Sequence, residues 1–250
     1  FFFFFLTFFA PYRTLAPDID LVRVHRSCFH LLAFDPAGKR LASGGFHGEV
    51  RVWSVADGSA ITTLARHQDA VRGLAWLDDE RLISADRSGR LLLRQLSSAR
   101  VVSSVQLAAV SNLALSPAHS WLLVTGGTRL YKLALPSLQT LAQRDVGSRL
   151  LSVAVSHGTG RIALSSRDGR VRLLDSNLQD IAELPRPSRD ALDLRFSPDG
   201  TTLLAGGWFR LLVWDLRQLR LEERPTEHLG KLISVDISPD GERWLSLGRS

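Results

Sequence analysis

A unit of about forty residues recurs along the chain, and no other feature restricts the possible folds as strongly. The equivalent positions are Ala33, Ala75, Ala114, Ala154, Arg195 and Asp236, which are separated by 42, 39, 40, 41 and 41 residues. Each unit contains a short apolar strand, a turn, a second strand that ends in small residues, a tight turn and a third, alternating strand. This period predicts a repeat architecture in which each unit buries its faces against its neighbours.

Turn sequences separate the strands of each unit. Those at 197–200 and 238–241 read Ser-Pro-Asp-Gly, and the turn at 35–38 reads Asp-Pro-Ala-Gly. Proline presets φ at the first turn position, aspartate accepts hydrogen bonds from nearby amides and glycine tolerates a positive φ, so the chain reverses without strain. The segments at 49–53 and 170–174 alternate in polarity, and no segment carries a helical stripe. The sequence therefore predicts an all-β fold.

Two signatures accompany the repeat. The dipeptide positions at the end of the third strand are read as Trp53-Ser54, Arg94-Gln95, Tyr131-Lys132, Leu174-Asp175 and Trp214-Asp215. Histidines stand seven residues before the first-strand apolar position at His25, His67 and His228. With these residues and this period, the sequence resembles the WD-repeat (WD40) β-propellers over residues 20–250, which implies blades of about 40 residues arranged around a ring.

The resemblance also implies a buried polar network in each repeat. In the family, hydrogen bonds join the histidine, a Ser or Thr of the second strand, an Asp of the following tight turn and the Trp. The matching residues here are His25, Ser43, Trp53, His67, Ser84, Asp168, Trp214, Asp215 and His228. His47 replaces the aspartate in the first repeat. In the second repeat, Ser88 replaces the aspartate and Arg94 replaces the tryptophan. No repeat is therefore expected to hold all four members. The network is interpreted as structural, because it satisfies buried polar groups.

The expected organisation is an apolar lead at 1–19 followed by a propeller at 20–250. The repeats are placed near 26–65, 66–105, 106–145, 146–186, 187–227 and 228–250, the last being partial. Five complete units and a fragment favour a truncated seven-bladed ring, since an unfinished blade leaves a strand edge unpaired. The alternative is a six-bladed ring that borrows a strand at 21–24. The run at 1–10 is too short to span a membrane, and it is read as a signal remnant or an upstream segment.

The sequence carries no motif for catalysis or for a cofactor. It contains no nucleotide-binding loop, zinc-protease motif or nucleophile elbow, and Cys28 is its single cysteine. The histidines outside the repeat positions lie in different repeats or on different sides of a blade, so no metal site is expected. We therefore expect no catalytic residues, no cofactor and no enzymatic activity. The lone cysteine favours a cytoplasmic protein, with export as the alternative.

Basic and aromatic residues gather in the loops on which propellers usually bind their partners. The residues expected to contact a partner are Phe46, Arg87, Arg167, Trp208, Phe209 and Lys231. Together with a net charge of +6, they predict a non-catalytic scaffold for a protein or peptide, with acidic partners favoured. Two alternatives stay open: a regulatory propeller fused to a catalytic domain, and a basic face that binds nucleic acid or anionic lipid. The oligomeric state is also open.

Overall fold

A computed structural model describes residues 29–228, 230–238 and 240–248, and every regular element in these ranges is a β-strand. The strands form five antiparallel sheets of four strands and a sixth sheet of two. The apolar lead, the strand expected at 21–24, His25 and Cys28 lie outside the described residues.

Within each sheet the strands follow chain order. The first sheet contains β1 (Phe29–Phe34), β2 (Arg40–Gly45), β3 (Val50–Ser54) and β4 (Ala60–Leu64). The second contains β5 (Val71–Trp76), β6 (Arg81–Asp86), β7 (Arg90–Gln95) and β8 (Val101–Gln106). The third contains β9 (Asn112–Leu115), β10 (Trp121–Gly126), β11 (Arg129–Ala134) and β12 (Thr140–Asp145). The fourth contains β13 (Leu150–Val155), β14 (Ile162–Ser166), β15 (Val171–Leu174) and β16 (Asp180–Leu184). The fifth contains β17 (Leu192–Phe196), β18 (Thr202–Gly206), β19 (Arg210–Asp215) and β20 (Arg220–Pro225), and the sixth contains β21 (Leu232–Ile237) and β22 (Trp244–Gly248).

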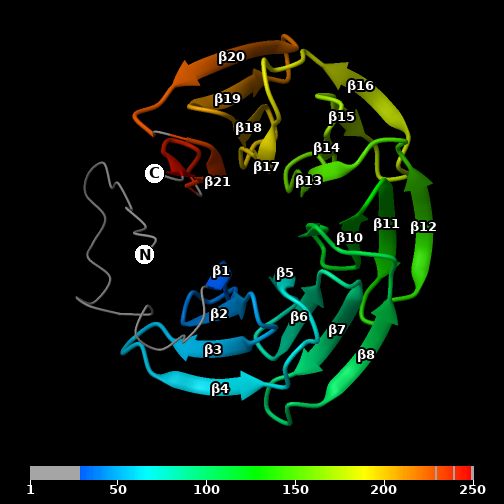
Figure 1. The fold of residues 1–250 in the computed structure, drawn as a ribbon, viewed down its shortest axis with the longest axis vertical. Coiled ribbons are helices and arrows are strands. Elements are labelled where there is room, and N and C mark those ends of the chain that lie inside the picture. The colour runs from blue at the N-terminus through cyan, green and yellow to red at the C-terminus, as the bar shows by residue number, and fades with distance from the viewer. Residues whose placement is uncertain (1–28, 229, 239, 249–250) are drawn as a thin grey trace.

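The sheets are arranged around a common centre in the order of the chain (Figure 1). The first strands of the sheets face the centre, whereas β4, β8, β12, β16 and β20 form the outer rim (Figure 1). The first strand of each sheet contacts the first strand of the next, from β1 and β5 through to β17 and β21. This arrangement confirms the predicted all-β architecture of propeller blades, and we number the blades 1 to 6 in chain order.

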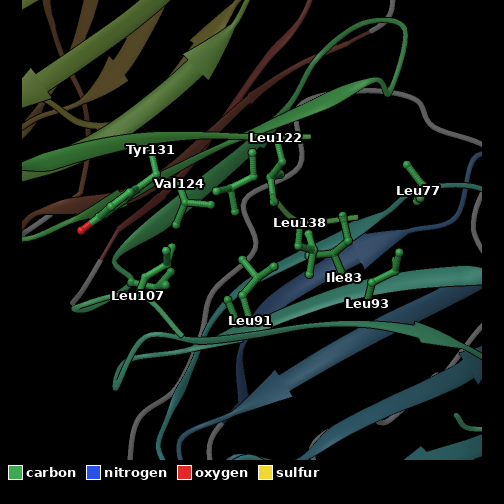
Figure 2. Packing of buried hydrophobic residues seen from close by; sticks show 12 residues of the cluster. Leu77, Ile83, Leu91, Leu93, Leu107, Leu122, Val124, Tyr131 and Leu138 are labelled. Atoms are coloured by element: carbon green, nitrogen blue, oxygen red, sulfur yellow. The ribbon is translucent and has the colours of Figure 1, made fainter. Parts of the chain in front are cut away.

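The core lies between neighbouring blades. Figure 2 shows the cluster between blades 2 and 3, where Ile83 and Leu91 meet Leu122, Val124 and residues around them. The second strand of each complete blade is buried along almost its whole length. The fourth strands consist mostly of exposed and half-buried residues, because one face meets water, but Leu64 and Leu184 at the ends of β4 and β16 are buried.

Candidate functional site

Two sets of loops meet at one edge of the ring and form a surface that we call the loop face. The first set joins the second and third strands of the blades, at 46–49, 87–89, 127–128, 167–170 and 207–209. The second set leads into the next blade, at 65–70, 107–111, 146–149, 185–191 and 226–231, with 229 outside the described residues. Each blade's strand pairing places these two sets at the same end of its second strand.

Backbone hydrogen bonds hold the two sets of loops together. The N–H of Arg87 donates to the carbonyl of Ala70 at 2.8 Å, and the N–H of Arg167 donates to the carbonyl of Arg149 at 2.8 Å. Gly48 shows how close the approach is, because a Cβ added there would lie 2.2 Å from the carbonyl oxygen of His67, and its φ is +83°. Only glycine fits this position without strain. The loops therefore present their side chains from a constrained backbone.

Blade 2 contains a complete buried triad. The Nδ1 of His67 lies 3.0 Å from Asp86 Oδ2, and its Nε2 lies 2.8 Å from Ser84 Oγ. All three side chains are buried. Burial lowers the pKa of His67 more than the Asp86 carboxylate raises it, so the ring is neutral. Nδ1–H then donates to Asp86, and the Ser84 hydroxyl donates to Nε2.

The expectation that the second repeat lacks an aspartate for this network was therefore wrong. The carboxylate comes from Asp86, the last residue of β6, and not from the turn position that Ser88 occupies. Ser88 instead donates its hydroxyl to Asp86 Oδ1 at 2.6 Å, and the N–H of Arg90 donates to the same oxygen at 3.1 Å. The aspartate lies two residues before the position that the family pattern predicts. The hydrogen bond to the histidine is therefore kept, although the predicted position holds a serine. One feature of the sequence could have indicated this role for Asp86. The second strand of blade 2 ends in an aspartate, whereas the equivalent strands β2 and β14 end in glycine and serine.

Arg94 lies next to this triad in place of a tryptophan. Its side chain is only 3% exposed, and its Nε and Nη1 atoms are buried without a hydrogen-bond partner in the described part of the chain. Burial lowers the pKa of the guanidinium, and the charge of Arg90 lowers it further. Blade 2 thus holds one satisfied polar triad and one poorly satisfied cation.

Strand register corrects one of the dipeptide positions. Trp53 pairs with Leu41 and Arg94 pairs with Leu82, whereas the equivalent Leu122 of blade 3 pairs with Leu133. Leu133, and not Tyr131, therefore occupies the tryptophan position. Tyr131 was assigned to this position because it is aromatic. It lies two residues before Leu133, on the same face of the strand.

The other expected network residues form smaller sets of contacts. Trp53 Nε1 donates to Ser43 Oγ at 2.8 Å, whereas Trp214 Nε1 donates to the carbonyl of Pro185 at 2.9 Å, because Ala205 provides no hydroxyl. His228 Nε2 lies 3.0 Å from Ser246 Oγ. Asp215 accepts backbone hydrogen bonds within its own turn.

Asp168 has no histidine partner, because Val146 stands at the histidine position of blade 4. Its carboxylate accepts a hydrogen bond from the Ser166 hydroxyl at 2.5 Å and another from the N–H of Arg170 at 3.2 Å. Burial raises the pKa of Asp168, but these hydrogen bonds and the charge of Arg170 outweigh it, so the net shift is downward. The carboxylate therefore remains ionised near neutral pH.

Three of the expected contact residues lie together. Arg167, Trp208 and Lys231 line one open pocket of about 550 Å³, with residues of the 185–191 segment and Asp168. The Lys231 Nζ lies 4.4 Å from the centroid of the Trp208 ring, and the Arg189 Cζ lies 5.8 Å from it. Trp208 is half-buried, and the neighbouring ring of Phe209 is 48% exposed.

Phe46 and Arg87 do not line this pocket. Phe46 is 45% exposed, with the Arg72 guanidinium 6.0 Å from its ring centroid. Arg87 Nε pairs with Asp69 Oδ2 at 3.0 Å, so part of its charge is already neutralised within the protein. The structure thus divides the expected contact residues between a pocket around Trp208 and separate positions on blades 1 and 2.

The loop face combines aromatic rings with basic side chains. Within the described ranges, no group of three or more His, Cys, Asp or Glu side chains is arranged to hold a metal ion. No helix in the same ranges is long and apolar enough to cross a membrane. The face offers instead partly exposed aromatic rings beside guanidinium and ammonium groups, which suit recognition of an anionic surface.

Comparison with known families matches two segments of the chain. The profile of the WD domain, G-beta repeat, matches residues 22–54 and 180–215. The second match runs from the outer strand of blade 4 to the end of β19, and the two matches end at Trp53-Ser54 and Trp214-Asp215. No curated protein matches the chain.

Proposed function

The chain is a WD-repeat protein, and we propose that it acts as a non-catalytic scaffold that binds an acidic protein or peptide on its loop face. WD40 repeats generally mediate protein–protein interactions, and the family is typically non-catalytic. The observation that carries the proposal is the half-buried Trp208, flanked by Lys231 and Arg189 in an open pocket. Aromatic and arginine side chains contribute much of the free energy at protein interfaces.

The rest of the face supports the same partner chemistry. Phe209 and Phe46 expose almost half of their surface, and Arg167 and Arg149 come from adjacent loops. Acidic partners are attracted to such a surface over a range of about 10 Å at moderate ionic strength. Residues 20–250 are proposed as the WD-repeat unit, and the single cysteine suits the reducing conditions of the cytoplasm.

A peptide array tests the proposal. Acidic, neutral and basic peptides of equal length are immobilised and probed with the purified chain and with the double variant Arg87→Glu/Arg167→Glu. We expect the chain to prefer acidic peptides and the double variant to lose at least about tenfold in affinity, because charge reversal repels an anionic partner.

The matched control is Lys39→Glu/Arg100→Glu, which makes the same change in net charge at exposed turns on the opposite edge of the blades. Equal binding by the double variant and the unchanged chain would refute the proposal. Tighter binding to a long nucleic acid than to any peptide, falling steeply with salt, would replace it with the polyanion alternative.

A further inference from the structure

Two cations lie close to the ring of Trp208, and a third lines the same pocket. The two at the ring are Lys231 and Arg189, and the third is Arg167. Within the described residues, none of the three has an ion pair with a carboxylate at 4.0 Å or less. Gathering like charges is unfavourable unless an anion lies among them. Among all the side chains that line the pocket, four are basic and two are acidic, so the pocket carries a net charge of +2.

The backbone that carries these groups is already in place. Trp208 and Lys231 form an antiparallel bridge, and the N–H of Leu232 donates to the carbonyl of Gly207 at 2.9 Å. The N–H of Phe209 donates to the carbonyl of Gly230 at 3.0 Å. A site held in this way loses little conformational entropy when a ligand binds. The backbone of Trp208 and Lys231 is thus positioned before any partner arrives.

Several arginines of the loop face outside the pocket already have acidic partners. Arg66 pairs with Glu49 at 3.1 Å, Arg87 pairs with Asp69, and Arg210 lies 3.7 Å from Glu223. Asp168 and Asp190 line the pocket itself. This alternation of charge interrupts the continuous basic track that a long nucleic acid needs. A single compact anion matches the pattern better than a polymer does.

We propose that this pocket, defined by Arg167, Arg189, Trp208 and Lys231, binds a phosphorylated serine or threonine side chain of the protein partner. The proposal rests on the proposed function and specifies its ligand. A phosphate monoester carries a charge of about −1.5 to −2 near neutral pH and offers three acceptor oxygens. Arginine matches these oxygens with paired donors, and lysine adds a point charge. A carboxylate carries one negative charge, which is less than the net charge of +2 in the pocket, whereas a phosphate monoester matches that charge.

The test follows the Trp208 indole N–H signal by NMR, assigned with the variant Trp208→Phe. The probes are three short peptides of Gly and Ala that differ only at the central residue, which is phosphoserine, glutamate or serine. We expect the phosphoserine peptide to shift the signal saturably and to bind at least about tenfold tighter than the glutamate peptide, with no saturable shift from the serine peptide.

Blade 3 provides a matched control. Lys132 Nζ lies 4.6 Å from the ring centroid of Trp121, so Lys132→Ala removes the same type of cation–π pair away from the pocket. We expect Lys231→Ala and Arg189→Ala each to weaken the phosphopeptide about tenfold and Lys132→Ala to leave it unchanged.

Equal affinity for the phosphoserine and glutamate peptides would overturn the proposal, as would a Trp208 signal that no probe shifts. Either result could coexist with acidic-peptide binding on the array, so the proposed function would survive it. Saturation of the same signal by a single-stranded oligonucleotide at lower concentration than by the phosphopeptide would also overturn the proposal and assign the pocket to nucleic acid.

Discussion

The buried imidazole of His67 donates a hydrogen bond to the carboxylate of Asp86 across 3.0 Å, from the loop that enters blade 2 to the end of its second strand. The contact joins two residues nineteen positions apart and leaves neither side chain exposed. It connects a loop of the proposed binding face to the core of the blade. The stability of blade 2 and the position of that loop are therefore coupled.

Replacing Asp86 should be costly. Asp86→Ala leaves the buried Nδ1–H of His67 without an acceptor and also removes the acceptor of the Ser88 hydroxyl and the Arg90 N–H, so we expect a loss of about 3 kcal/mol in the free energy of unfolding. Urea denaturation measures the loss. Asp168→Ala is the matched control, because Asp168 is partly exposed and has no histidine partner, and it should cost about 0.5 kcal/mol or less. Equal losses in the two variants would contradict the role assigned to Asp86.

Acid should weaken blade 2 through His67. The pKa of His67 in the folded chain is lowered from 6.5, chiefly by burial, so protonation favours the unfolded chain. Its stabilising contribution is complete above pH 6.5 and is lost as the pH falls toward the lower, folded pKa. The stability should then fall by up to about 1.4 kcal/mol per pH unit in that window. Thermal unfolding of the unchanged chain and of His67→Gln from pH 7.5 to 5 isolates this contribution, and parallel curves would exclude it.

Removing the guanidinium of Arg94 should stabilise the chain. Arg94→Met keeps the length and apolar stem of the side chain but removes buried donors that lack partners, so we expect a gain of about 1 to 2 kcal/mol. Arg90→Met serves as the control, since Arg90 is exposed, and should change stability by about 0.5 kcal/mol or less. A destabilised Arg94→Met variant would mean that the guanidinium has a stabilising contact in solution.

Two glycines should respond differently to alanine. Gly48 and Gly38 both have positive φ, at +83° and +66°, but a Cβ meets the carbonyl oxygen of His67 at Gly48 and nothing within 4 Å at Gly38. Gly38→Ala should cost about 1 kcal/mol from backbone strain alone. Gly48→Ala should cost about 3 kcal/mol, because the loop must also move away from His67. Similar melting temperatures for the two variants would show that the loops separate easily.

The sequence alone was sufficient to identify the repeat and to predict its local structure. The period, the Ser-Pro-Asp-Gly turns and the alternating strands are encoded by residues close together in the chain, and they predicted an all-β propeller correctly. Outer strands such as β8 were harder to recognise, since four of the six residues of β8 are exposed and the strand carries little apolar pattern.

The tertiary structure decided which side chains meet. Asp86 became the partner of His67 because a strand end, and not the turn after it, faces the incoming loop. Arg167, Trp208 and Lys231 come from three separate loops, and only the packing of blades 4, 5 and 6 brings them to one pocket. Such contacts depend on the angle and distance between blades, which the packing of many buried side chains sets together. The sequence by itself therefore determined the blades, and their packing determined the network and the pocket.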